Sequence, residues 1–166
     1  MAKHKGILVS LLVVAAAIAA DDPGGWTKAK WGMTEAQLAE AFGPDIVRLD
    51  PPDSIAGGKI KIFQAVDVQI GGTPFRAKLV PDKDGKLDSV LFSARDKKDV
   101  NQYTFQSLQE LLVQKYGRPW KSAAGQDAEF QWSLGSTVIT LSFTQYKDVD
   151  WSNLILQYRH KSPDPL

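Results

Sequence analysis

The side chains that most often carry catalysis are scarce in this sequence. Histidine, the commonest general base, occurs at His4, within an N-terminal leader, and at His160, next to the C-terminal tail, and cysteine is absent. No nucleophile-elbow motif accompanies His160, so the sequence does not support a serine–histidine–acid site. The neighbouring carboxylates that glycoside hydrolysis uses occur in two pairs, Asp127 with Glu129 and Asp148 with Asp150. Because such pairs are also common on solvated surfaces, we expect a protein that is not an enzyme.

The turn Asp82-Lys83-Asp84-Gly85 has acidic residues before a glycine, as a calcium-binding loop does. Aligning Gly85 with the loop glycine places Val80 and Leu91 at the first and last ligand positions, where neither side chain can bind the ion. Zinc would have no cysteine and, outside the leader, a single histidine. The sequence therefore predicts a β-turn here, with no metal site and no cofactor.

Tryptophan is the most suggestive residue type, because an exposed indole can stack on a sugar or anchor a protein partner. Trp31 and Trp132 fall at core positions. Trp26, Trp120 and Trp151 fall at strand starts, near a helix end or in loops, where we expect exposure. The competing interpretation is that these three side chains cover the ends of the core.

Short polar side chains on the outer faces of two expected strands complete the candidate binding surface. They are Gln131, Thr140, Glu129 and Ser142. Such a face is either simply solvated or a docking surface for a protein.

Residues 1–19 have the layout of a secretory signal peptide. Lys3 and Lys5 precede an apolar run, and Ala17-Ile18-Ala19 supplies a small-x-small cleavage site. The run is shorter than the roughly 20 residues that cross a bilayer, which favours cleavage over retention as an anchor. With no cysteine, the exported chain has no disulfide. The sequence predicts a bacterial periplasmic or secreted protein with no membrane span after cleavage.

The charge of the chain argues against a nucleic-acid partner. The 20 basic and 19 acidic residues become 18 and 19 once Lys3 and Lys5 leave with the leader, so the formal net charge changes from +1 to −1. The basic residues are also scattered along the chain rather than clustered.

Capping signals and apolar periodicity predict two helices. The first lies between Gly32 and Pro44, with Thr34 and Gln37 as a capping box and a glycine–proline stop. The second runs from about Asn101 to Tyr116, with Phe105, Leu108, Leu112 and Tyr116 on one stripe and Leu111 and Val113 at its edges.

Alternating residues and tight turns predict a set of strands. We expect them at about 26–31, 60–70, 73–81, 87–94, 127–134, 137–146 and 153–159, with hairpin turns at Gly71-Gly72 and Gly135-Ser136 and a linking segment around Pro51 and Pro52. The order helix, hairpin, strand then occurs twice. We therefore expect one α+β domain over residues 20–160, made of two helix-plus-antiparallel-sheet halves, an α-β-β-β unit repeated at about 26–95 and 96–160, before a polar tail at 161–166.

One short signature resembles a known group of proteins. Gly32-Met33-Thr34, followed by Leu38 and by Phe42-Gly43-Pro44, resembles the G-M-T…L-G-x-P pattern of small exported bacterial α/β domains. These include the SmpA/OmlA outer-membrane-assembly lipoproteins and, in fold, the β-lactamase inhibitor proteins. The chain has neither the lipid-anchor cysteine of the first group nor the disulfides of the second. The resemblance implies a protein-binding or envelope-associated role rather than a reaction.

Together these features predict an exported, non-catalytic module that binds an envelope protein through its outer sheet face or its tryptophans. The alternative is a carbohydrate-binding module or minor glycosidase that uses Trp120, Trp151 and nearby acidic residues.

Overall fold

The structure is a computed structural model that describes residues 20–123, 127–146, 148 and 151–161. Its longer strands are β3 (Ile46–Ile55), β4 (Ile60–Ile70), β5 (Thr73–Pro81), β6 (Leu87–Ala94), β8 (Asp127–Leu134), β9 (Thr137–Tyr146) and β10 (Trp151–His160), and the shorter ones are β1 (Gly25–Trp26), β2 (Ala29–Lys30) and β7 (Lys121–Ala123). The helices are α1 (Glu35–Phe42) and α2 (Gln102–Tyr116), with short 3-10 turns η1 (Gly43–Asp45) and η2 (Lys97–Asp99).

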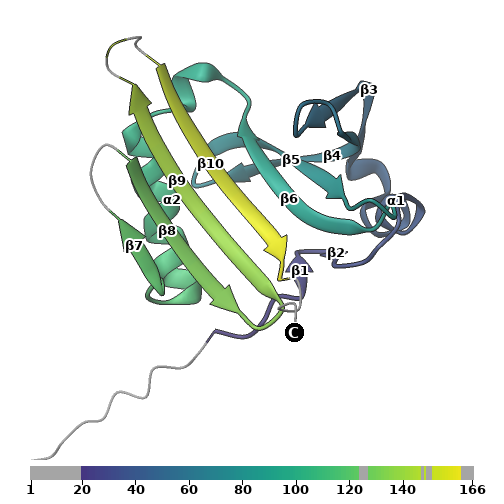
Figure 1. Cartoon of the computed structure of the whole chain (residues 1–166), viewed down its shortest axis with the longest axis horizontal. Helices are drawn as coiled ribbons and strands as arrows, with labels where there is room; N and C mark the ends of the chain where they lie inside the picture. The colour runs from purple at the N-terminus through teal and green to yellow at the C-terminus, as the bar shows by residue number, and fades with distance from the viewer. Residues whose placement is uncertain (1–19, 124–126, 147, 149–150, 162–166) are drawn as a thin grey trace, which may run out of the picture.

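Eight of these strands form one antiparallel sheet in the order β3-β4-β5-β6-β10-β9-β8-β7, and β1 pairs with β2 in a small sheet of its own (Figure 1). The predicted pair of helix-plus-sheet halves is therefore wrong, and the described chain is mostly β. The last strand, β10, pairs with β9 on one side and with β6 on the other. This pairing satisfies backbone groups that two separate sheets would each leave on an exposed edge.

Both predicted hairpins are confirmed, and counting residues outward from each turn gives the register that the structure shows. Val66 lies opposite Ala77 and Asp67 opposite Arg76 across the Gly71-Gly72 turn. Gln131 lies opposite Thr140 across the Gly135-Ser136 turn. Alternation of apolar and polar residues sets these registers, because a slip by one residue would turn the apolar side chains to the other face.

Three segments differ from the prediction. Residues 26–31 do not form one strand, because β1 and β2 fold back on each other around Thr27, whose φ is 51°. The expected linker around Pro51 and Pro52 belongs to β3, which pairs with β4 with a register shift between Arg48 and Asp53. Strand β7 was not expected. Both additional strands, β3 and β7, lie at edges of the sheet, where proline and short pairing are tolerated.

The helices form where the sequence predicts them. Thr34 and Gln37 make the capping box of α1. The Asn101 side chain caps α2 by accepting a hydrogen bond from the Thr104 amide at 2.9 Å. The buried face of α2 includes the whole predicted stripe of Phe105, Leu108, Leu112 and Tyr116. Helix α2 lies across β8 and β9, whereas α1 packs beside β3 at the other end of the sheet (Figure 1). The central strands β6 and β10 lie between the two helices.

Candidate functional site

The outer face of β8 and β9 carries the four polar residues that the sequence singles out. Gln131 pairs with Thr140 and Glu129 with Ser142, so the four lie in neighbouring cross-strand pairs. The Glu129 carboxylate accepts hydrogen bonds from the Lys121 amine at 2.6 Å and from the Gln131 amide at 3.0 Å. The Glu129 carboxylate, the one charged group among the four residues, is therefore already paired within the protein.

The two candidate tryptophans are exposed but far apart. The amide of Trp120 donates to the carbonyl of Gln131, level with Thr140 on β9, whereas Trp151 lies opposite Tyr146 on the same strand. These levels are about 20 Å apart along a strand that rises about 3.4 Å per residue. Trp151 instead faces Tyr146, with ring centroids 5.0 Å apart.

His160 does not approach the acidic pairs. It lies opposite Thr137 at one end of β9 and stacks on Trp31, whereas Asp127 lies nearer the other end. Asp150 lies outside the described residues. In the part of the chain that the structure describes, no group of three or more His, Cys, Asp or Glu side chains could hold a metal ion.

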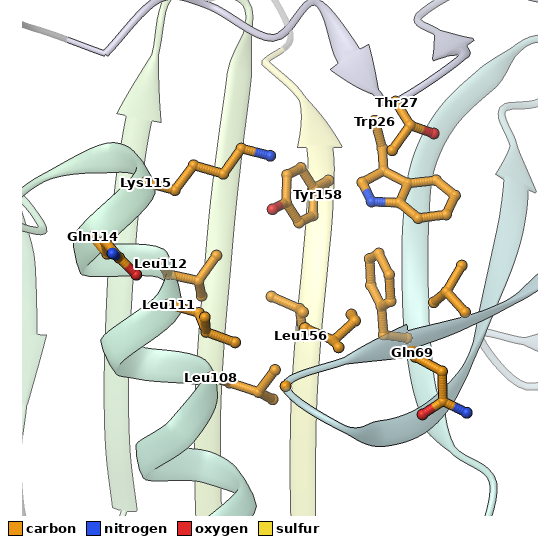
Figure 2. A pocket seen from close by; sticks show the side chains of 14 residues that line it. Trp26, Thr27, Gln69, Leu108, Leu111, Leu112, Gln114, Lys115, Leu156 and Tyr158 are labelled. Atoms are coloured by element: carbon orange, nitrogen blue, oxygen red, sulfur yellow. The ribbon is translucent and has the colours of Figure 1, made fainter.

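A cleft of about 670 Å³ lies on the helix side of the sheet. Phe92 of β6 and Leu156 of β10 line it from the central strands, and three leucines of α2 line one side. Figure 2 shows Leu108, Leu111 and Leu112 pointing from the helix toward Leu156. The cleft lies where α2, which packs on β9, leaves a gap over β6 and β10, although the residues at its floor, Phe92 and Leu156, are each only 2% exposed.

Trp26 and the end of the β4–β5 hairpin form the opposite side. Val68 and Ile70 of β4 line the cleft, as does Trp26 of β1 (Figure 2 labels Trp26). Trp26 stacks on Phe42 at a centroid distance of 6.1 Å and meets Phe92 edge-on at 5.2 Å. These aromatic contacts hold an indole, which the sequence predicts to be exposed, against the cleft.

Polar groups gather at one end of this apolar cleft. Lys115 extends its amine from α2 toward Tyr158, and Thr27 lies beside Trp26 at the same end (Figure 2). The Tyr158 hydroxyl is 3.3 Å from the Tyr116 hydroxyl. Burial, and then the neighbouring Tyr116, raise the pKa of Tyr158 well above its ordinary value, so Tyr158 is a neutral hydrogen-bonding group.

The N-terminal segment forms a second hollow of about 340 Å³, which shares Trp26, Thr27 and Lys115 with the cleft. Asp22 anchors this segment to the β8–β9 turn. Its carboxylate accepts hydrogen bonds from the amides of Gly24 at 3.0 Å and Ser136 at 2.6 Å, and from the Thr137 hydroxyl at 2.9 Å. Loss of hydration by itself would raise the pKa of Asp22, but these hydrogen bonds outweigh that effect and lower the pKa from 3.8 to about 2.

A charged cluster lies on the outer face of the first hairpin. Both carboxylate oxygens of Asp67 accept from Arg76, at 2.8 and 3.0 Å, and Arg95 donates to the same carboxylate. The hydrogen bonds from Arg76 are the main reason that the pKa of Asp67 is about 2. The cross-strand pairing of Asp67 with Arg76 is predicted by the hairpin register, whereas the contribution of Arg95 is not.

Sequence reasoning missed the cleft, although its residues carry a signal. Leu111 extends the apolar stripe of α2 on the side of Leu108, and Trp26 follows the Pro/Gly segment after the leader. These local signals mark both residues as apolar. They do not show which apolar edge lines a cavity, because that depends on the order of the strands.

Comparisons with known proteins do not identify a family. Neither the family models nor the curated proteins contain a match to this sequence. Among solved structures, the chain is similar to the crystal structure of a DUF4309 family protein, YjgB, from Bacillus subtilis, with a TM-score of 0.43 and 11% identity. The match covers 77% of this chain and 78% of the other. The resemblance to SmpA/OmlA lipoproteins stays a prediction. No helix among the described residues has the length and apolar character to cross a membrane.

Proposed function

We propose that this protein is an exported, non-catalytic binding module that holds an apolar small molecule in the cleft between α2 and the β4–β5 hairpin. The supporting observation is the cleft itself. Its volume of about 670 Å³ lies within the range of small-molecule sites, and apolar side chains with a few polar groups line it. The predicted partner surface on β8 and β9 presents polar side chains at Glu129, Gln131, Thr140 and Ser142, whereas large apolar side chains supply most of the affinity at protein interfaces.

The envelope location is part of this proposal and depends on the leader at residues 1–19. An exported binding module needs no catalytic residues, and the separation of His160 from the acidic residues is consistent with that role. The carbohydrate-binding alternative is favoured by one observation. Tyr146 and Trp151 are 48% and 52% exposed, and their rings lie side by side at the end of β9 and β10.

A neutral environment-sensitive dye, N-phenyl-1-naphthylamine, tests the cleft. We expect saturable binding of one dye per chain, weakened about tenfold by Leu111→Glu, because the loss of one leucine contact corresponds to about 1.5 kcal/mol. Val113→Glu is the matched control. Val113 is on the same helix and equally exposed, at 39% against 38% for Leu111, but does not line the cleft.

Equal effects of the two substitutions, or no saturable binding to the parent chain, would contradict the proposal. A parallel titration with soluble glycans separates the alternative. Glycan binding that survives Leu111→Glu but is lost in Trp151→Ala would place the function at the exposed aromatic pair instead.

A further inference from the structure

We propose that the ligand of the cleft is an amphiphile with an apolar chain and an anionic head group, and that Lys115 binds the head. This inference rests on the proposed function and adds the chemical class of the ligand. The chain would lie over Phe92 and Leu156, against the leucines of α2. The head would lie at the end of the cleft where Lys115, Tyr158 and Thr27 gather.

Charge is the first argument for an anionic head. Lys115 is the single charged residue among those that line the cleft, and no carboxylate lines it. Among the described residues, Lys115 makes no ion pair within 4.0 Å, although its amine lies 5.1 Å from the centre of the Tyr116 ring. A cation in such a position attracts an anion and repels a cationic head.

The acidic groups nearest to this end do not alter that assignment. Asp21 and Asp22 line the second hollow, which Trp26, Thr27 and Lys115 also line, but they do not line the cleft. Asp22 is already occupied by the amides of Gly24 and Ser136 and by the hydroxyl of Thr137.

The separation of polar from apolar groups is the second argument. The cleft walls away from Lys115 consist mainly of leucine, isoleucine, valine and phenylalanine side chains, with Gln69 at the hairpin. Gln114, next to Lys115 on α2, also lines the cleft. A wholly polar ligand would leave its hydrogen-bonding groups unpaired along these walls, whereas an alkyl chain would not. An exposed lysine at the mouth lets the head keep part of its hydration.

Displacement of the neutral dye by simple amphiphiles tests the inference. The probes are octanoate, decanoate and dodecanoate for chain length, and dodecyl phosphate, dodecanol and dodecyltrimethylammonium for the head. We expect affinity to rise about fourfold for each added methylene until the cleft is full. We expect dodecanoate and dodecyl phosphate to bind about fivefold more tightly than dodecanol, and the ammonium compound most weakly.

The variant Lys115→Met tests whether Lys115 causes the preference for anionic heads. This substitution keeps the apolar stem, so it should abolish the difference between dodecanoate and dodecanol but leave the dependence on chain length. Lys61→Met is the control: it also removes one positive charge, but at the end of β4 away from the cleft. It should change neither the preference for anionic heads nor the dependence on chain length. A preference for phosphate over carboxylate, or the reverse, would identify which anionic head the site takes.

The possible failures are distinguishable. Dependence on chain length without a preference for anionic heads overturns this inference and leaves the proposed function in place. A preference that persists in Lys115→Met also overturns it. Absence of both dye binding and alkyl binding would refute the proposed function itself.

Discussion

Replacing Asp22 by alanine would release the N-terminal segment from the β8–β9 turn. The Asp22 carboxylate receives hydrogen bonds from two backbone amides and from the hydroxyl of Thr137, which is fully buried. The Thr137 oxygen also accepts a hydrogen bond from the Trp31 indole at 3.0 Å. The Asp22 carboxylate thus connects the lead-in segment to the β8–β9 turn and, through Thr137, to Trp31 after β2.

The contacts set the expected size of the effect. The Ser136 and Gly24 amides can donate to water instead, so the loss of their hydrogen bonds to Asp22 should cost little. The buried Thr137 hydroxyl would lose its acceptor, at a cost of about 1–3 kcal/mol. A fall in the pKa of Asp22 from 3.8 to about 2 corresponds to about 2.4 kcal/mol without screening. Because Asp22 is exposed, we reduce the electrostatic part to about 1 kcal/mol and expect Asp22→Ala to cost about 2 kcal/mol in total.

Urea unfolding of Asp22→Ala, Thr137→Val and the double variant measures the coupling directly. We expect the losses of unfolding free energy in the two single variants to add up to about 1 kcal/mol more than the loss in the double variant, because each single substitution removes the same hydrogen bond. The contribution of Trp31 cancels in this cycle, since Thr137→Val removes its acceptor in both backgrounds.

The same bond gives a pH dependence with a definite sign. The pKa of Asp22 is lower in the folded protein, so its contribution is complete above about pH 5 and falls as the pH drops through 3.8 toward 2. The stability difference between the parent chain and Asp22→Asn should shrink over this range. Additive single effects, or a difference that stays constant from pH 5 to about 2.5, would refute the assignment of Asp22 as the anchor.

Two further predictions concern the turn and the leader. Gly135→Ala should lower the free energy of unfolding in urea by about 2 kcal/mol, because Gly135 has a φ of 58° and an added Cβ would lie 2.6 Å from an Asp22 oxygen. Gly72→Ala is the control: Gly72 has a φ of 83° but open space around it, so the loss should be about half as large. Equal losses in the two variants would contradict this prediction. Expression with export in a bacterium should yield a chain whose mass corresponds to a start at Ala20, whereas an intact N-terminus after export would refute cleavage at Ala17-Ile18-Ala19.

The hairpins and helices could be predicted because their signals are local. The Gly71-Gly72 and Gly135-Ser136 turns, together with alternating side chains, determine which residues face each other across the strands. The capping box of Thr34 with Gln37 requires only a few consecutive residues.

The candidate site could be predicted only in part. The outer pair of Gln131 with Thr140 follows from one hairpin register. The cleft combines Trp26, Leu111 and Leu156, which come from three distant segments of the chain. The Asp22 anchor joins residues more than a hundred positions apart, so no nearby residue marks it.

The sequence by itself determines the positions of the turns, the ends of the helices and the alternation of each hairpin, because these depend on contacts among near neighbours. The tertiary structure alone decides that β6 pairs with β10. Backbone hydrogen bonds are alike at every strand edge, so strand order depends on which edges stay unpaired after all local elements have formed. That pairing merges the two expected halves into one sheet and leaves the apolar cleft over its centre.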